Sequence, residues 1–171
     1  MKPVNDIICP DLDVLFIGFN PSIKSSETGH HFANRSNRFW KILHQAGLTP
    51  YQYLPEQDRD LLELNYGLTN IVARPTKAAD EISKEEYNEG RLLLAEKLQT
   101  YQPKIACYVG KGVYEQLAKK KKIPWGIQEN SVVPGIIDFV APSSSGLVRM
   151  KLNEIVDIYK LVNKQLRELQ Q

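Results

Sequence analysis

The stretch Val14-Leu15-Phe16-Ile17-Gly18-Phe19-Asn20-Pro21 contains the feature that decides the fold. Its first four residues are all apolar, which is typical of a strand covered on both faces in a parallel sheet. Gly18 ends the apolar run, and Asn20-Pro21 is a frequent turn pair. The stretch therefore predicts a buried strand that leads into a polar loop at one edge of a sheet.

Helices and further strands alternate along the rest of the chain. A helix with apolar residues at helical spacing is predicted between the cap candidate Ser36 and Gly47. Ser83 and Glu86 form a capping box that predicts the start of a second helix. The remaining elements are strands at 67–72, 105–109, 131–133 and 136–140, a short helix after 112, and an amphipathic helix at 152–166.

This alternation predicts an α/β fold of three layers, with a mostly parallel central sheet flanked by helices. The 171 residues contain no repeat or linker, so we expect one domain at 11–171 after an N-terminal tail at 1–10. No apolar run approaches the roughly 18 residues of a membrane helix, and the first residues do not resemble a signal peptide. We expect a monomer with a cytoplasmic location and no membrane partner.

The cysteines and histidines do not predict a metal site. Cys9 and Cys107 form no Cys-x-x-Cys pair, and Cys107 lies in an apolar strand, as a buried reduced thiol does. His30, His31 and His44 lack the spacing of zinc ligands. We therefore expect chemistry without a metal ion or other cofactor.

The net charge of +2 is too small to indicate a nucleic-acid partner. Four consecutive lysines at Lys119 to Lys122 are more specific. They are typical of a solvated turn after a helix, and a direct DNA contact is the alternative. Charge alone leaves the partner open.

Three loops follow predicted strands, at 18–32, 70–76 and 141–149. Ligands of α/β folds bind at this carboxyl edge of the sheet. The first loop combines glycine with small and hydroxyl residues, so its backbone amides can bind an anion or an oxyanion. A turn made only for packing has the same pattern.

Several motifs follow one another in order along these loops. The first are Gly18-Phe19-Asn20-Pro21, Gly29-His30-His31-Phe32, Asn37-Arg38-Phe39-Trp40-Lys41 and Ala46-Gly47-Leu48-Thr49. They are followed by Thr69-Asn70-Ile71-Val72-Ala73-Arg74-Pro75-Thr76, Tyr101-Gln102-Pro103-Lys104-Ile105-Ala106 with Gly110-Lys111, and Pro142-Ser143-Ser144-Ser145-Gly146-Leu147. This order resembles the family of mismatch-specific uracil-DNA glycosylases and thymine-DNA glycosylases, from Val14 to the final helix. The resemblance implies a uracil-DNA-glycosylase-like fold, hydrolytic removal of a flipped uracil or related base from DNA, and no cofactor.

In this resemblance Asn20 matches the asparagine that holds the catalytic water. A neutral amide donates and accepts hydrogen bonds but cannot take up a proton as a carboxylate can. Asn20 can therefore orient water without acting as a base. Because a general base contributes about 10²–10⁴-fold in rate, we expect slow turnover.

The resemblance also implies a base-binding set, which is Gly18, Phe19, Ser25, His31, Phe32 and Asn70. Phe32 matches the aromatic that stacks on the flipped base, and Asn70 matches the asparagine that hydrogen-bonds its edge. Ser25 falls where the family places a residue near base carbon 5, so its hydroxyl would favour uracil over thymine. His31 matches a histidine beside the pocket.

The DNA-binding set implied by the resemblance is Lys111, Ser143, Ser145, Gly146, Leu147, Val148 and Arg149. Gly146-Leu147-Val148 matches the wedge that fills the space left by the flipped base, with the Leu147 side chain between base pairs. The backbone at Gly146 and Val148 could face the orphaned guanine. The serines, Lys111 and Arg149 would contact phosphates.

Base preference stays open, because Phe19 and Ser22 replace the family's usual isoleucine and glycine. The stretch 141–145 follows the thymine branch, whereas Gly146-Leu147 follows the uracil branch. The expected partner is duplex DNA with G·U or G·T mismatches, which would place the protein at the nucleoid. One alternative is a protein that binds mismatches or abasic sites with little turnover. A nucleotide- or phosphate-binding protein is another, although the first loop lacks the glycine spacing of such sites.

Overall fold

The computed structural model describes residues 1–171, and its centre is a five-stranded sheet of order β2-β1-β3-β5-β4. β1 (Val14–Gly18), β2 (Tyr66–Asn70), β3 (Ile105–Val109) and β5 (Ile137–Ala141) are parallel. The short β4 (Gly126–Ile127) pairs antiparallel with β5 at one edge. The predicted mostly parallel α/β sheet is confirmed.

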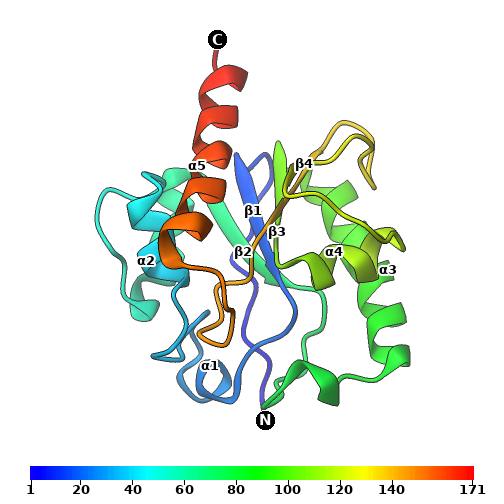
Figure 1. The fold of residues 1–171 in the computed structure, drawn as a ribbon. Coiled ribbons are helices and arrows are strands. Elements are labelled where there is room, and N and C mark those ends of the chain that lie inside the picture. Colours follow the sequence, from blue (N-terminus) through cyan, green and yellow to red (C-terminus); the bar gives the residue numbers. More distant parts are fainter.

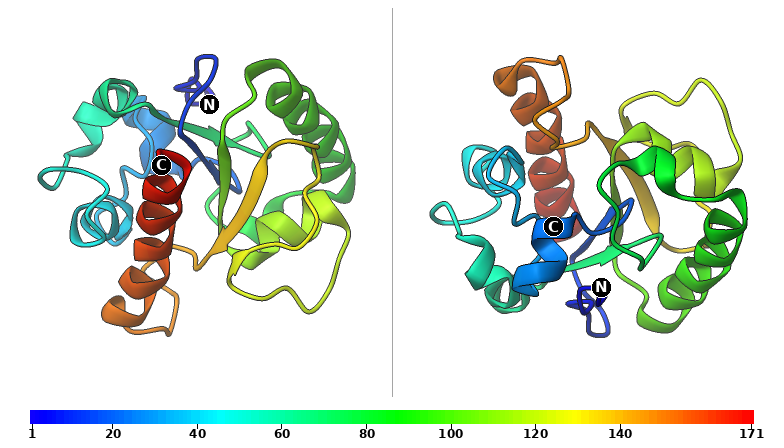
Figure 2. Two further views of the ribbon diagram at one scale, coloured as in Figure 1. Left: turned by 90° about the horizontal axis from the view of Figure 1, so that it is seen from above. Right: turned by 90° about the horizontal axis from the view of Figure 1, so that it is seen from below.

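Helices cover both faces of the sheet, which gives three layers (Figures 1 and 2). α2 (Phe39–Gln45), the 3₁₀ helix η1 (Pro55–Leu64) and α5 (Leu152–Leu169) pack on one face. α3 (Lys84–Tyr101) and α4 (Lys111–Ala118) pack on the other. The short α1 (Ile23–Thr28) and the 3₁₀ turn η2 (Ala79–Glu81) lie in the segments after β1 and β2. None of the helices has the length and apolar content needed to cross a membrane.

The apolar run of β1 contributes to two cores, one on each side of the sheet. Val14 and Phe16 belong to the core under α2 and α5, while Leu15 and Ile17 belong to the core under α3 and α4. Successive side chains of a strand point to opposite faces, so a central strand must be apolar throughout. This position explains why β1 shows no alternation of polar and apolar residues.

The capping box predicted for α3 is confirmed. The Ser83 hydroxyl accepts a hydrogen bond from the Glu86 N–H at 3.2 Å, and the Glu86 carboxylate accepts one from the Ser83 N–H at 3.1 Å. Gly47, predicted to end the preceding helix, has a left-handed backbone with φ of 79°. Cys107 is a buried free thiol, as predicted, and Cys9 is also free.

The strand predicted at 131–133 is not formed. The Val132 N–H donates to the Asp138 carboxylate at 2.9 Å, so it is not available to a neighbouring strand. The antiparallel edge strand is instead β4, five residues earlier in the chain at Gly126–Ile127. The buried Asp138 carboxylate therefore accepts the hydrogen bond that a carbonyl of a neighbouring strand would otherwise accept.

The helix cap predicted at Ser36 is also wrong. α2 begins at Phe39, and the Asn37 side chain accepts a hydrogen bond from the Phe39 N–H at 3.0 Å. Ser36 donates its hydroxyl to Asn34 instead. An asparagine one position later in the chain reaches the first turn of the helix, which leaves Ser36 in the loop before it.

Part of the segment predicted as a tail packs on β2. Ile7 pairs with Leu68 through two backbone hydrogen bonds and is 2% exposed. Val4 is also buried. Lys97 of α3 forms an ion pair with Asp6 at 2.6 Å, which ties the segment to the domain.

Candidate active site

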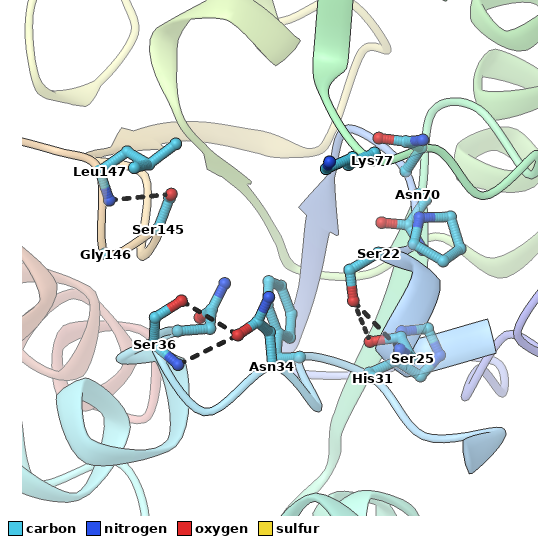
Figure 3. A pocket seen from close by; sticks show the side chains of 14 residues that line it. Ser22, Ser25, His31, Asn34, Ser36, Asn70, Lys77, Ser145, Gly146 and Leu147 are labelled. Carbon is cyan, nitrogen blue, oxygen red and sulfur yellow. Dashed lines mark hydrogen bonds between the residues drawn. The ribbon is translucent and has the colours of Figure 1, made fainter. Parts of the chain in front are cut away.

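Two adjoining cavities open where β1, β2 and β5 end, at the edge predicted from the three loops. Figure 3 shows the residues that line the larger one. Their volumes are about 430 Å³ and about 200 Å³. Asn20, Phe32, Asn70 and Ser145 line both cavities, so the two form one continuous hollow. All three predicted loops contribute to its walls.

Most of the residues predicted for the site lie in this hollow. The larger cavity is lined by Asn20, Ser25, His31, Phe32, Asn70, Ser145, Gly146 and Leu147, and the smaller one adds Gly18, Phe19 and Ser143. Lys111, Val148 and Arg149 line neither cavity. The Lys111 ammonium lies 4.1 Å from the centre of the Trp125 ring, and Val148 packs against the core under α5. Arg149 is exposed beside the loop.

The side-chain amide of Asn20 is held by two partners from the segment after β2. Its Nδ2 donates to the Arg74 carbonyl and to the Thr76 hydroxyl, each at 2.8 Å. A backbone carbonyl can only accept, so the atom that faces Arg74 must be the nitrogen. Both N–H groups are then occupied, and Oδ1 is left free as an acceptor. The sequence did not indicate Thr76 as a partner, because 56 positions separate it from Asn20.

The Asn20 partners are themselves fixed. Thr76 donates its hydroxyl to the Ala78 carbonyl at 2.8 Å. Arg74 makes a two-pronged ion pair with Glu86, at 2.7 and 2.9 Å, which couples the segment to the first turn of α3. The Arg74 guanidinium lowers the pKa of Glu86 to about 2, with help from the Ser83 N–H. Glu86 is therefore ionised at neutral pH and the ion pair is complete.

Ser25 lies on the opposite side of the first loop, where it is 2% exposed. Ser22 caps α1 by accepting from the Ser25 N–H at 3.0 Å, and its hydroxyl lies 3.1 Å from the Ser25 hydroxyl. The Ala33 N–H donates to the Ser25 hydroxyl at 3.1 Å. The Ser25 hydroxyl thus joins both ends of the loop and still lines the cavity.

Phe32 presents its ring to the hollow from a strained backbone. Its ring stacks on Phe39 with centroids 4.0 Å apart and planes 15° apart. Its φ of 51° lies in the left-handed region, which is rare for a bulky residue and occurs often at functional sites. Because Phe32 also lines both cavities, the part of the ring that Phe39 does not cover is available to a planar ligand.

Two further polar groups face the same space. Gly18 allows the Asn70 amide to lie over β1, since a Cβ at Gly18 would stand 2.8 Å from the Asn70 Oδ1. The Asn70 side chain makes no hydrogen bond within the protein. His31 donates from Nε2 to the Asn5 carbonyl at 2.7 Å, so Nδ1 carries the lone pair in the neutral ring. Burial lowers the pKa of His31, against the opposing effect of that hydrogen bond.

The loop after β5 forms the remaining wall. Leu147 is 94% exposed, the largest exposure among the large apolar side chains. The loop is anchored to the segment before α2, because Arg38 donates from its backbone to Ser144 at 2.9 Å and from Nη2 to Ser145 at 3.1 Å. Gly146 lies so close to this segment that a Cβ would stand 2.6 Å from the Ser36 carbonyl oxygen. The apolar side chain of Leu147 therefore points outward from a loop whose backbone is anchored.

Sequence reasoning missed several lining residues, above all Lys77. The larger cavity also includes Ser22, Asn34, Ser36 and Asn37, and the smaller one includes Thr76 and Ser144. Lys77 is the only residue with a formal charge among all of them. Its position directly after Arg74-Pro75-Thr76 was the available signal, since the predicted loop ended one residue too early. No aspartate or glutamate lines the hollow, and the chain contains no cluster of three metal-ligating side chains.

The comparisons with known proteins identify a family and a shared fold. The family model described as the uracil DNA glycosylase superfamily matches residues 6–169. Among solved structures, the solution NMR structure of a "putative Uracil DNA glycosylase" from Methanosarcina acetivorans matches with a TM-score of 0.59 and 20% sequence identity. The match covers 95% of this chain and 98% of that chain. At this identity the structural match shows a shared fold.

Proposed function

Since the chain belongs to the uracil DNA glycosylase superfamily, we propose that it removes uracil mispaired with guanine in duplex DNA. The reaction is hydrolysis of the bond between base N1 and sugar C1′, and it leaves an abasic site. The enzyme works as a monofunctional hydrolase without a metal ion or cofactor. Thymine opposite guanine is a second, slower substrate.

The observation that carries this proposal is the orientation of the Asn20 amide. Arg74 and Thr76 occupy both of its N–H groups, which leaves Oδ1 to accept a hydrogen bond from water. A water held in this way attacks C1′ as the C1′–N1 bond breaks, and the base leaves with the bonding electron pair. The water then loses its proton to solvent, because the cavity contains no carboxylate to take it.

The remaining walls are suited to a flipped pyrimidine. The Phe32 ring can stack on the base, and the uncommitted amide of Asn70 can pair with a donor and an acceptor on its edge. Ser25 faces base carbon 5, where its hydroxyl disfavours the methyl group of thymine. Leu147 fills the vacated space in the DNA stack, which supports base flipping from a duplex.

The test is excision measured under single-turnover conditions on duplexes with G·U, A·U and G·T, and on single-stranded uracil, all in the presence of EDTA. We expect the fastest release of base from G·U and slower release from G·T. If none of the four substrates releases its uracil or thymine, the proposal is contradicted. Activity that is lost in EDTA and restored by magnesium or zinc would contradict the metal-free mechanism.

A protein that binds mismatches or abasic sites and barely turns over is the second candidate. It is favoured by the absence of any carboxylate from the cavity, since a general base would add about 10²–10⁴-fold in rate. The same assay separates the candidates. A catalyst completes one turnover at enzyme excess, whereas a binding protein shows a tight complex and no released base.

A further inference from the structure

The hollow around Asn20 contains one cationic side chain, Lys77, among neutral groups. The other polar lining residues are amides and hydroxyls, and His31 is a buried imidazole whose pKa burial lowers. Lys77 lines both cavities. It is exposed, so it lies at the mouth of the hollow and not in its depth. A negatively charged ligand entering the hollow meets this cation first.

Lys77 has no partner within the protein. Neither an ion pair nor a hydrogen bond occupies its ammonium group, whereas Lys97 pairs with Asp6 at 2.6 Å and Lys104 pairs with Asp13 at 3.0 Å. Lys111, the lysine predicted from the sequence to contact DNA, lies over the Trp125 ring. Lys77 is therefore free to bind an external anion, and its position beside Thr76 and Asn20 fixes where that anion would lie.

The wall opposite Lys77 carries serine hydroxyls that are held by backbone amides of the same loop. The loop after β5 places Ser143 and Ser145 in the smaller cavity together with Lys77. The Lys77 side chain is directed toward this loop (Figure 3). Within the loop, the Ser145 N–H donates to the Ser143 hydroxyl and the Leu147 N–H donates to the Ser145 hydroxyl, each at 3.2 Å. These bonds hold the serine hydroxyls at the rim.

We propose that Lys77 completes a clamp on the DNA phosphate next to the flipped nucleotide, opposite the serines that the family resemblance already implies as phosphate contacts. This inference rests on the proposed function. Lysine and serine side chains hold phosphates without reading sequence, and the hollow between them is continuous with the place of the base. The departing base is a less suitable partner for Lys77, because Phe32 and Asn70 serve the base and Lys77 lies at the exposed mouth. The clamp fixes the sugar next to Asn20 and its water.

The experiment compares wild-type protein with Lys77→Gln on duplexes that carry a non-hydrolysable 2′-fluoro deoxyuridine opposite guanine. In two further duplexes a neutral methylphosphonate replaces the phosphate 5′ or 3′ of that nucleotide. Lys164→Gln is the matched control, since it removes the same charge from an exposed site in the C-terminal half of α5. The C-terminal end of α5 lies at the opposite end of the molecule from α1 (Figure 1). Dissociation constants are measured over a range of salt concentrations.

We expect the wild type to lose several-fold in affinity on one of the two methylphosphonate duplexes. Lys77→Gln should lose a similar factor on unmodified DNA and lose nothing more on that methylphosphonate. Its plot of log affinity against log salt should also be shallower by about one unit, as expected when one phosphate contact disappears. Lys164→Gln should respond to the methylphosphonates as the wild type does.

Three results would overturn the clamp. The first is an equal loss of affinity on the methylphosphonate duplexes in Lys77→Gln and wild type. The second is an effect of Lys77→Gln that is confined to the excision rate of saturated complexes. The third is a covalent adduct with the abasic product that borohydride traps in wild type only. The last two would assign Lys77 to the base or to the sugar carbon. If the wild type neither binds these duplexes nor releases uracil from the natural ones, the proposed function fails, and the clamp with it. If the wild type excises uracil normally, but the affinity losses from Lys77→Gln and from the methylphosphonate are additive, only the clamp is overturned.

Discussion

Two walls of the hollow, one formed around Asn20 and the other by the loop that carries Leu147, differ in how many contacts their side chains make within the protein. The Asn20 wall is held by side-chain hydrogen bonds to Arg74 and Thr76 and by the ion pair of Arg74 with Glu86. The backbone of the Leu147 wall is anchored, but its outermost side chain is 94% exposed and has no apolar partner. The first wall is organised by contacts within the protein, whereas under the proposed function the second would gain its contacts from DNA. Chemistry and duplex recognition should therefore be separable by mutation.

The largest effect is expected on the Asn20 wall. Asn20→Ala should lower single-turnover excision from G·U duplex by at least about 100-fold, because a misplaced reactant loses that much, and should do so equally on single-stranded uracil. DNA affinity should change little. Rates are measured at enzyme excess and affinities on non-hydrolysable deoxyuridine.

Asn20→Asp sharpens this prediction. The carboxylate oxygen in place of Nδ2 would face the Arg74 carbonyl, so two acceptors would meet without a proton between them. We expect no rescue by aspartate, although it is a base. Wild-type excision by Asn20→Ala, or faster excision by Asn20→Asp, would show that the amide does not hold the water.

The next effect is expected on the Leu147 wall. Flipping a base takes a few kcal/mol, and each 1.36 kcal/mol corresponds to about tenfold in rate. Leu147→Ala should therefore slow excision from duplex G·U by about tenfold and leave single-stranded uracil nearly unaffected. Leu92→Ala, at a leucine of α3 that is 64% exposed, is the matched control. Equal losses on duplex and single strand would assign Leu147 to the pocket and not to the DNA stack.

Features that are encoded in short contiguous stretches could be predicted from the sequence. The buried strand at Val14–Ile17 and the loop after it follow from local pattern, because both faces of a central strand must be apolar. Family motifs then indicated Asn20, Phe32 and Leu147, which the structure places around one hollow. These residues lie in short contiguous stretches whose order alone carries the signal.

Residues that act through the path of a distant loop could not be predicted. The bond from Asn20 to Thr76 joins positions 56 residues apart, and Lys77 reaches the cavity because the segment after β2 runs beside the loop after β1, where the Thr76 N–H donates to the Pro21 carbonyl. Lys111 lies outside the hollow with its ammonium over the Trp125 ring, so its phosphate contact stays a prediction. The strand predicted at 131–133 is not formed, because a buried Asp138 side chain, and not a strand, meets that backbone.

A smaller effect is expected at Ser25, a buried residue that lines the larger cavity. Ser25→Ala should raise the ratio of G·T to G·U excision by about threefold, because a methyl group near carbon 5 changes discrimination only modestly. Both rates should fall, since the Ala33 N–H loses its acceptor. Ser25→Thr keeps the hydroxyl and adds a methyl group, so its ratio should not rise. An unchanged ratio in Ser25→Ala would show that this hydroxyl does not face base carbon 5.

The smallest effect is expected from pH. A general base in the hollow would make the excision rate rise by about tenfold per unit below its pKa, but no carboxylate lines the cavities. His31 is the one imidazole there, and burial lowers its pKa from the ordinary value of 6.5, so it stays neutral above that pH. Single-turnover rates on saturated G·U duplex should therefore vary by less than about twofold between pH 7 and 8.5. A steep rise over this range that disappears in His31→Gln would make His31 the base and reduce the Asn20 wall to a binding surface. A flat profile in both proteins leaves the preorganised amide as the group that acts on water.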